Sequence, residues 1–153
     1  MAKKFNIYCD GVDKTWYNSS NVIYSECIDH DNKPKTLKVV FSNGTQYEYK
    51  NVDVRDYLLL RESDSQGKAL NRLIKEKNYE YEKLENANLD EINDELFFRS
   101  NNGFYVENNK NHFEIKNNKD ESVFKLSKPL EEGYFELVLD ILKSVGITTK
   151  TVL

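Results

Sequence analysis

The chain has 153 residues, of which 31% are charged, 39% are hydrophobic and 12% are aromatic. This length suits one domain of common size or two very small ones, and the apolar content excludes a disordered chain. The formal net charge is −4, with 14 Lys and Arg against 13 Asp and Glu in residues 1–84, and 8 against 13 in residues 85–153. A general nucleic-acid coat carries a strong basic excess, so any contact with nucleic acid must be local here.

The first half of the chain has the pattern of an antiparallel sheet. Its third and fourth β-patterned runs flank Asn43-Gly44, and Asn-Gly between two such runs is a strong hairpin signal because both central turn positions need positive φ. A polar connection that contains glycine and the only tryptophan, Trp16, separates the first two runs. The four predicted strands are residues 5–9, 21–28, 36–41 and 45–52.

Two short helices are predicted after the hairpin. Asp53 is a suitable N-cap for the first, over residues 54–62, because its carboxylate can accept a hydrogen bond from a backbone NH of the first turn. Ser63 or Ser65 is the candidate cap of the second, over residues 67–77.

The second half of the chain alternates polar turns with short apolar runs. Residues 85–95 are acidic and mostly polar, which indicates a boundary or a linker. Four β-patterned runs separated by Asn-rich turns then predict a meander. Apolar residues recur at helical spacing from Leu130 to Val145 and predict a helix that packs across the sheet. The four runs are residues 96–100, 104–108, 112–116 and 123–127.

These elements together predict an α+β fold. Residues 1–84 would form an antiparallel hairpin sheet with two short helices, and residues 96–153 a β-meander packed by one amphipathic helix. Residues 85–95 would be the acidic linker between them. The sequence leaves open whether the second part is a separate domain or completes the first.

The segment after the Asn-Gly turn resembles a known family. Tyr47-Glu48-Tyr49 lies on the second strand of the hairpin, and Ser65-Gln66-Gly67, Ile74 and Tyr79-Glu80-Tyr81 follow it. With these residues, the chain from about residue 18 to 84 resembles the KTSC domain, a module found alone in bacterial and phage proteins and at the C-terminus of some lysyl-tRNA synthetases.

The resemblance has two departures and one functional implication. The family commonly has proline where Asp53-Val54 stands, and an aromatic residue where residues 68–70 stand. The departures affect ligand contacts expected at the helix junction. The resemblance implies a binding module without catalytic residues, with nucleic acid, RNA in particular, as the suggested ligand.

Two groups of side chains are candidates for such binding. Tyr47 and Tyr49 (the tyrosine pair) share one face of their strand, and two rings on an open sheet face can stack bases. The alternative is that both rings cap the core beneath the helices. Lys68, Arg72 and Lys75 (the basic stripe) lie at spacings of four and three on the second helix, where they would hold phosphates or form a solvated face.

No catalytic, metal or cofactor site is predicted. The chain has no phosphate-binding loop, no dinucleotide fingerprint and no nucleophile motif. Cys9 and Cys27 stand far apart without CxxC spacing, so we predict buried thiols. His30 and His112 lie in polar stretches typical of solvated loops.

The sequence also predicts the cellular location of the protein and the type of genome that encodes it. No apolar run approaches the roughly 20 residues of a membrane helix, and the first residues lack the apolar region of a secretory signal. We therefore expect a cytoplasmic protein that does not contact a membrane. The abundance of Asn and Lys over Arg is typical of AT-rich genomes, such as those of low-GC Gram-positive bacteria and their phages.

Three functions fit the sequence. The first is binding of RNA or single-stranded nucleic acid through the tyrosine pair and the basic stripe, with the second half of the chain providing oligomerisation or a partner surface. The second is a phage anti-defence protein that binds a host protein through its acidic surface. The third is an oligomeric protein that sequesters a small nucleotide between Trp16, the tyrosine pair and Arg72 or Lys68. The family resemblance favours the first, and the net charge favours the second.

Overall fold

The chain folds into two compact units, Met1–Leu96 (unit 1) and Phe97–Leu153 (unit 2). The computed structural model describes residues 3–31, 34–101, 103–108, 110–128, 133–144 and 149–152. Each unit combines a β-sheet with helices, so the predicted α+β class is confirmed. Within these described ranges, no helix has the length and apolar character needed to cross a membrane.

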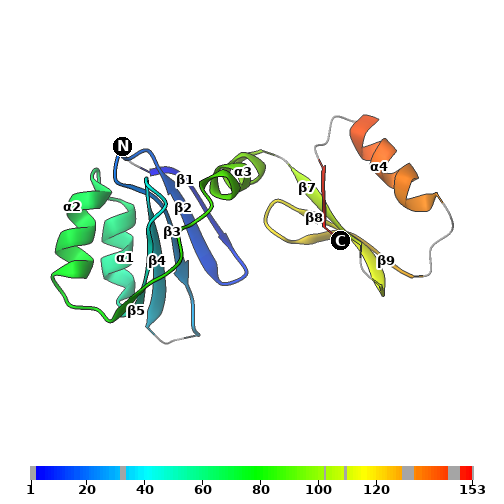
Figure 1. Cartoon of the computed structure of the whole chain (residues 1–153). Coiled ribbons are helices and arrows are strands. Elements are labelled where there is room, and N and C mark those ends of the chain that lie inside the picture. Colours follow the sequence, from blue (N-terminus) through cyan, green and yellow to red (C-terminus); the bar gives the residue numbers. More distant parts are fainter. Residues whose placement is uncertain are drawn as a thin grey trace. The chain divides into compact units, whose positions relative to one another are not determined.

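Unit 1 is built on a six-stranded antiparallel sheet in which every strand pairs with its neighbour in the sequence (Figure 1). The predicted hairpin is confirmed as β4–β5. Its turn uses one positive φ, 91° at Gly44, whose NH donates to the carbonyl of Phe41 at 2.9 Å. The strands are β1 (Lys3–Cys9), β2 (Val12–Tyr17), β3 (Val22–Ile28), β4 (Lys35–Phe41), β5 (Gln46–Val52) and β6 (Tyr81–Lys83).

The predicted connection around Trp16 is instead strand β2. Asp10 and Gly11 both have positive φ, 48° and 76°, which is the conformation of a two-residue turn between antiparallel strands. Strand β2 escaped detection because Asp13 and Thr15 are polar on the side that faces the main core, so the expected alternation of apolar and polar residues is lost.

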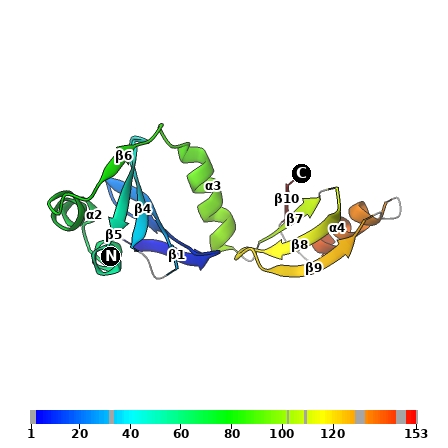
Figure 2. The same cartoon turned by 90° about the horizontal axis from the view of Figure 1, so that it is seen from below.

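Helices cover both faces of this sheet (Figure 2). α1 and α2 lie on one face, and α3 lies on the other. The predicted cap of α1 is confirmed, because the carboxylate of Asp53 accepts from the NH of Arg55 at 2.8 Å. Ser65 is the N-cap residue of α2 without a capping hydrogen bond from its side chain. The helices are α1 (Val54–Arg61), α2 (Gln66–Leu70) with its π-helical continuation η1 (Asn71–Lys75), and α3 (Leu89–Ser100).

The segment predicted to be a linker forms most of α3 and belongs to the core of unit 1. Leu89, Ile92 and Leu96 pack against the buried cluster around Trp16. The indole Nε1 of Trp16 also donates to the carbonyl of Ile92 at 3.0 Å. The run 96–100, predicted to be a strand, is the last turn and a half of the same helix. Apolar residues at spacings of three and four therefore outweigh the acidic composition.

Unit 2 is a four-stranded sheet in the order β10-β7-β8-β9, covered by one helix, α4. The meander is confirmed for β7, β8 and β9, whereas β10 pairs in parallel with β7. The rings of Phe113 and Phe135 meet edge to face at 5.1 Å and join the sheet to the helix. The elements are β7 (Phe104–Asn108), β8 (His112–Asn117), β9 (Ser122–Ser127), α4 (Tyr134–Ser144) and β10 (Thr149–Val152).

The excess of acidic residues lies in unit 1. Residues 1–96 contain 14 basic and 18 acidic residues, whereas residues 97–153 contain 8 of each. The acidic residues of segment 85–95 produce this difference, because they fall within unit 1. An acidic surface therefore belongs to α3 and to the residues just before it, whereas unit 2 has no net charge.

Tyr17 contributes stability that should be lost in alkaline solution. Burial raises the pKa of Tyr17 to about 12, against an ordinary value of 10.0. Because the folded pKa is the higher one, the neutral phenol stabilises the fold fully below pH 10, and this stabilisation is lost as the pH rises towards 12. We expect the free energy of unfolding to fall over this range, and to fall less steeply in Tyr17→Phe, as measured by urea unfolding monitored through Trp16 fluorescence.

The matched control is Tyr8→Phe, which removes a hydroxyl from a ring that is 58% exposed. That variant should keep the pH dependence of the wild type. If Tyr17→Phe also keeps it, the phenol of Tyr17 does not couple folding to pH.

Candidate functional site

The two members of the tyrosine pair have different surroundings. Both rings lie on the sheet face that carries α1 and α2, with centroids 6.4 Å apart. Tyr49 is 3% exposed and belongs to the core, whereas Tyr47 is half-buried at its edge. Burial raises the pKa of Tyr49 to about 12. Tyr49 therefore has a core position, and Tyr47 is the member with an accessible surface.

A third tyrosine, Tyr81 of β6, extends the aromatic surface to the edge of the sheet. Tyr81 pairs across the strands with Tyr49, and its ring centroid lies 5.8 Å from that of Tyr49 and 5.9 Å from that of Tyr47. The ring is 61% exposed because β6 is an edge strand. On the other side, Phe41 meets Tyr47 edge to face at 6.0 Å.

The rings of Tyr47, Tyr49 and Tyr81 line a groove of about 660 Å³, which we call the tyrosine groove. Tyr47 and Tyr49 form one wall, and the segment 75–81 supplies the other. A second hollow of about 380 Å³ shares Tyr47 and Lys75 with the groove and extends it towards Phe41. The sheet edge thus offers a concave surface with aromatic walls.

Lys75 lines the tyrosine groove, and Lys83 lies beside Tyr47 on the neighbouring strand. The Nζ of Lys75 lies 5.7 Å from the centre of the Phe41 ring. Lys83 is the cross-strand partner of Tyr47, so it shares the face of Tyr81. Lys68 and Arg72 are exposed on α2 and η1 but do not line the groove. Of the basic stripe, the structure therefore brings Lys75 to the tyrosines.

Tyr81 and Lys83 are site residues that were not predicted from the sequence. Tyr79, Tyr81 and Lys83 alternate with Glu80 and Glu82, which is the period of a strand. That alternation was the available signal. Three residues are too few for a confident strand assignment, and only the pairing with β5 turns Tyr81 and Lys83 towards Tyr47.

Trp16 lies away from the tyrosine pair, in the core beneath α3. It is 2% exposed, and its ring packs 4.9 Å from Tyr24 and 5.8 Å from Phe5. Adjacent residues on a strand point to opposite faces, so Trp16 and Tyr17 enter different cores. The predicted pocket between Trp16 and the tyrosines is not formed.

Comparison with protein families assigns the part of unit 1 that carries the groove. Residues 19–81 match the family of the KTSC domain. The chain contains a KTSC domain. The match begins just before β3, ends at Tyr81 and includes the four tyrosines that line the groove, whereas β1, β2 and unit 2 lie outside it. No curated protein and no solved structure matches the chain.

A buried carboxylate anchors the 75–81 wall of the groove within the KTSC domain. Asp56 of α1 is 5% exposed and accepts hydrogen bonds from Lys77 Nζ at 2.5 Å and Tyr79 Oη at 2.6 Å. Burial alone would raise the pKa of Asp56, but these two donors outweigh it and hold the pKa below its ordinary value. The carbonyl of Glu80 also accepts from the NH of Lys50 at 2.8 Å. The wall is therefore tied to both α1 and β5.

Gln66 and Gly67 fix the junction between the two helices of the KTSC domain. Gln66 is fully buried, and its Nε2 donates to the carbonyls of Ser63 at 2.8 Å and Leu60 at 3.3 Å. A Cβ at Gly67 would lie 2.7 Å from Nδ2 of Asn21. The Ser-Gln-Gly sequence therefore closes the end of α1 and lets α2 approach the start of β3.

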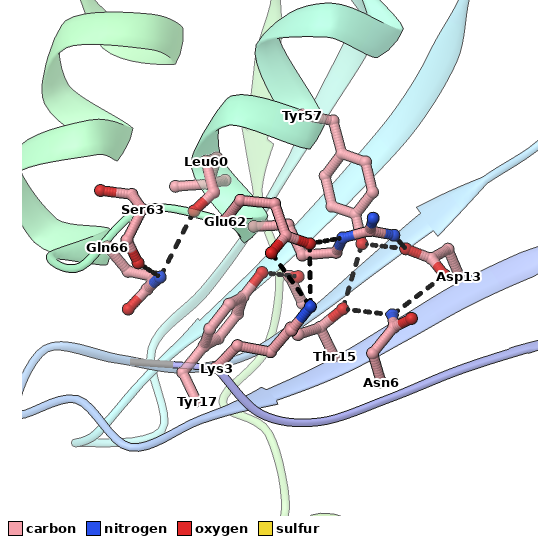
Figure 3. Close-up of polar contacts among 12 residues, drawn as sticks. Lys3, Asn6, Asp13, Thr15, Tyr17, Tyr57, Leu60, Glu62, Ser63 and Gln66 are labelled. Carbon is pink, nitrogen blue, oxygen red and sulfur yellow. Dashed lines mark hydrogen bonds and ion pairs between the residues drawn. The ribbon is translucent and has the colours of Figure 1, made fainter. Parts of the chain in front are cut away.

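A polar network fixes α1 of the KTSC domain to strand β2, which lies outside the family match (Figure 3). One carboxylate oxygen of Asp13 accepts from Tyr57 Oη at 2.5 Å and from Arg61 Nη1 at 3.0 Å. The other accepts from Asn6 Nδ2 at 3.0 Å. The hydroxyls of Thr15 and Tyr57 lie 3.2 Å apart. Burial, together with Asp13, raises the pKa of Tyr57, so the network is held by a neutral phenol.

Among the described residues of unit 2, one group has metal-ligand chemistry. Ligand atoms of Glu107, His112 and Glu114 lie within 4.8 Å of one another. The ammonium of Lys116 lies 3.2 Å from Glu107 and 3.7 Å from Glu114, so a positive charge already balances these carboxylates. The group is an ion-pair cluster on one face of β7 and β8.

The anchoring role of Asp56 gives a prediction for hydrogen exchange. The NH of Asp53 donates to Tyr79 Oη at 3.1 Å, and the NH of Lys50 reaches the same wall. Asp56→Asn loses charge-assisted hydrogen bonds, so we expect both amides to exchange faster, by about tenfold for a loss of about 1.4 kcal/mol. Exchange is measured by NMR on the full chain.

The control is Asp29→Asn, which removes another carboxylate that binds a lysine at 2.5 Å, here Lys35. Exchange at Asp53 and Lys50 should stay unchanged in that variant. Unchanged exchange in Asp56→Asn as well would show that Asp56 does not hold the wall.

Proposed function

We propose that the protein is a non-catalytic binding protein whose KTSC domain binds single-stranded nucleic acid, RNA in particular, in the tyrosine groove. The observation that carries this proposal is the ring of Tyr81, which is 61% exposed on an edge strand and contacts Tyr47 and Tyr49. Bases stack on accessible aromatic rings largely independently of sequence. Stacking requires unpaired bases, so single strands are favoured over duplexes.

The cations of the groove supply the second part of the proposal. Lys75 and Lys83 flank the rings and can each contact a phosphate, while Glu80 lines the same groove and repels phosphate. The 14 basic and 18 acidic residues of unit 1 provide no general attraction for polyanions. Affinity should therefore depend on a few contacts and weaken with salt.

Two other predicted functions remain as outcomes of the same experiments. A small nucleotide that competes fully with RNA would favour sequestration of nucleotides in the 660 Å³ groove. Absence of RNA binding at low salt would favour a host protein as the partner, as proposed for a phage anti-defence protein. The exposed carboxylates of α3, Asp90, Glu91 and Asp94, would then be the surface to mutate.

Replacement of Tyr81 tests the aromatic part of the site. Base stacking on an aromatic side chain contributes about 1–3 kcal/mol. We therefore expect Tyr81→Ala to weaken binding of labelled single-stranded RNA by about five- to 150-fold, as measured by fluorescence anisotropy at low salt.

Tyr8→Ala is the matched control, because Tyr8 also lies on an edge strand and is 58% exposed. It should bind RNA as the wild type does. Equal binding by wild type, Tyr81→Ala and Tyr8→Ala would place any RNA site outside the tyrosine groove. No binding by the wild type would refute the function itself.

Replacement of Lys75 tests the phosphate contact. Each phosphate contact on a single strand contributes about 0.7 to the slope of log K against log salt. We expect Lys75→Glu to weaken binding at low salt and to reduce this slope by about that amount, as measured by anisotropy over a salt series.

Lys4→Glu, an equal change of charge at an exposed position on β1, is the control. It should leave the slope unchanged. If both variants weaken binding equally, the interaction depends on net charge alone and does not involve a defined phosphate contact.

A further inference from the structure

The hollow beside Phe41 adjoins the tyrosine groove on the same face of the sheet of unit 1. It has a volume of about 380 Å³, and we call it the Phe41 hollow. Phe41 and Tyr47 both pack against the core cluster beneath α1 and α2, so both rings lie on the face that carries these helices. The Phe41 hollow and the tyrosine groove share Tyr47 and Lys75, which therefore lie at their boundary.

Three rings that reach the surface cross the strands in series. The sheet order β4-β5-β6 places Tyr47 of β5 between Phe41 of β4 and Tyr81 of β6. The ring centroids of Phe41 and Tyr81 lie 6.0 Å and 5.9 Å from that of Tyr47. Phe41 lines one hollow, Tyr81 lines the other, and Tyr47 lines both. Each hollow therefore offers an aromatic surface on which one base can stack.

Lys75 carries a positive charge at the boundary of the two hollows. Its side chain is exposed at the end of η1, and its Nζ lies 5.7 Å from the centre of the Phe41 ring. Within the part of the chain that the structure describes, no carboxylate pairs with this ammonium. One phosphate joins two neighbouring nucleosides of a strand, so a strand with a base in each hollow carries this phosphate past the boundary. Lys75 is placed to bind it.

The polar lining of the Phe41 hollow also suits a nucleotide. The described residues that line it include no carboxylate, whereas Glu80 lines the tyrosine groove. Ser42 and Thr45 line the hollow, and neither hydroxyl makes a hydrogen bond with another described residue. A hydroxyl both donates and accepts, so these two can bind the edge of a base or a ribose.

Backbone hydrogen bonds hold the turn that forms the Phe41 hollow. The NH of Ser42 donates to the carbonyl of Asn21, just before β3, at 2.7 Å. The NH of Ala87, just before α3, donates to the carbonyl of Gly44 at 2.8 Å. The turn is thus fixed from two sides, and little ordering of the chain opposes binding there.

We propose that the Phe41 hollow is a second nucleotide subsite, so that the smallest strand that fills the site is a dinucleotide whose linking phosphate binds Lys75. This subsite rests on the function proposed above, because the other base of the dinucleotide lies in the tyrosine groove. The site therefore recognises two linked nucleosides in preference to a free nucleotide.

Competition by short ligands tests the second subsite on the wild-type protein. Adenosine monophosphate and the dinucleotide ApA each compete with labelled single-stranded RNA, and displacement is measured by fluorescence anisotropy at low salt. We expect ApA to bind about five- to 150-fold more tightly than adenosine monophosphate, because its second base gains a stacking contact.

Two variants separate the two subsites. Phe41→Leu keeps an apolar side chain and removes the ring, so it should weaken ApA by about fivefold or more and leave adenosine monophosphate unchanged. Tyr81→Ala should weaken both ligands. The matched control is Phe124→Leu, which removes a ring that is 39% exposed on the sheet of unit 2 and should bind both ligands as the wild type does.

A neutral linkage tests the contact of Lys75 without relying on the fold of a variant. ApA with a methylphosphonate linkage keeps both bases and carries no charge between them. With the wild type it should bind about two- to fivefold more weakly than ApA. With Lys75→Gln the two ligands should bind equally, because the ammonium that distinguishes them is absent.

The possible failures of the two proposals are distinguishable. No binding of RNA by the wild type would refute the proposed function and the second subsite with it. RNA binding that Tyr81→Ala weakens, together with equal binding of ApA and adenosine monophosphate, would refute the second subsite alone. Unchanged binding of ApA by Phe41→Leu would place the second base outside the Phe41 hollow. A preference for the charged linkage that persists in Lys75→Gln would exclude Lys75 as the partner of the linking phosphate.

Discussion

The carboxylate of Asp13 determines where the helical layer of unit 1 lies on its sheet. It accepts from the phenol of Tyr57 and the guanidinium of Arg61, and so joins β2 to both ends of the buried face of α1. A partly buried carboxylate without these donors would be strongly destabilising, which makes this pairing of strand and helix specific. The same helix carries Asp56, which holds the wall of the tyrosine groove through Lys77 and Tyr79. The position of the groove wall, and with it the shape of the tyrosine groove, therefore depends on β2, a strand that lies outside the matched domain.

An element was predicted correctly where neighbouring residues alone determine its structure. It was not where the structure depends on contacts with residues distant in the sequence. The β4–β5 hairpin and the cap at Asp53 follow from a turn dipeptide and from one side chain, and both were predicted. Strand β2 was not, because the polar Asp13 and Thr15 face the interior as members of a network that no window of sequence displays. Helix α3 was read as a linker because its acidic residues masked three apolar positions at helical spacing. Buried polar groups and acidic helices are where composition is a poor guide to burial.

The candidate site shows the same division. Because alternate residues of a strand share a face, the sequence correctly placed Tyr47 and Tyr49 on one face. It could not show that Tyr49 is buried in the core while Tyr47 stays half-buried at its margin, since that depends on how far the helical layer extends. Tyr81 becomes a neighbour of the pair only when β6 joins the edge of the sheet, 32 residues after Tyr49 in the sequence. The alternation of side chains along a strand also places Trp16 on the sheet face opposite to that of the tyrosine pair. This follows only once β2 is known to be a strand.

The sparse charge of the groove limits what it can bind. Unit 1 offers an open groove with few cations, which limits its affinity for a nucleic-acid strand. The net charge of −4 also opposes the approach of a polyanion. A strand in the groove would therefore have to be held by a few specific contacts instead of by general attraction. The ring of Tyr81, 61% exposed beside Tyr47 and Tyr49, offers the kind of stacking contact that such binding requires.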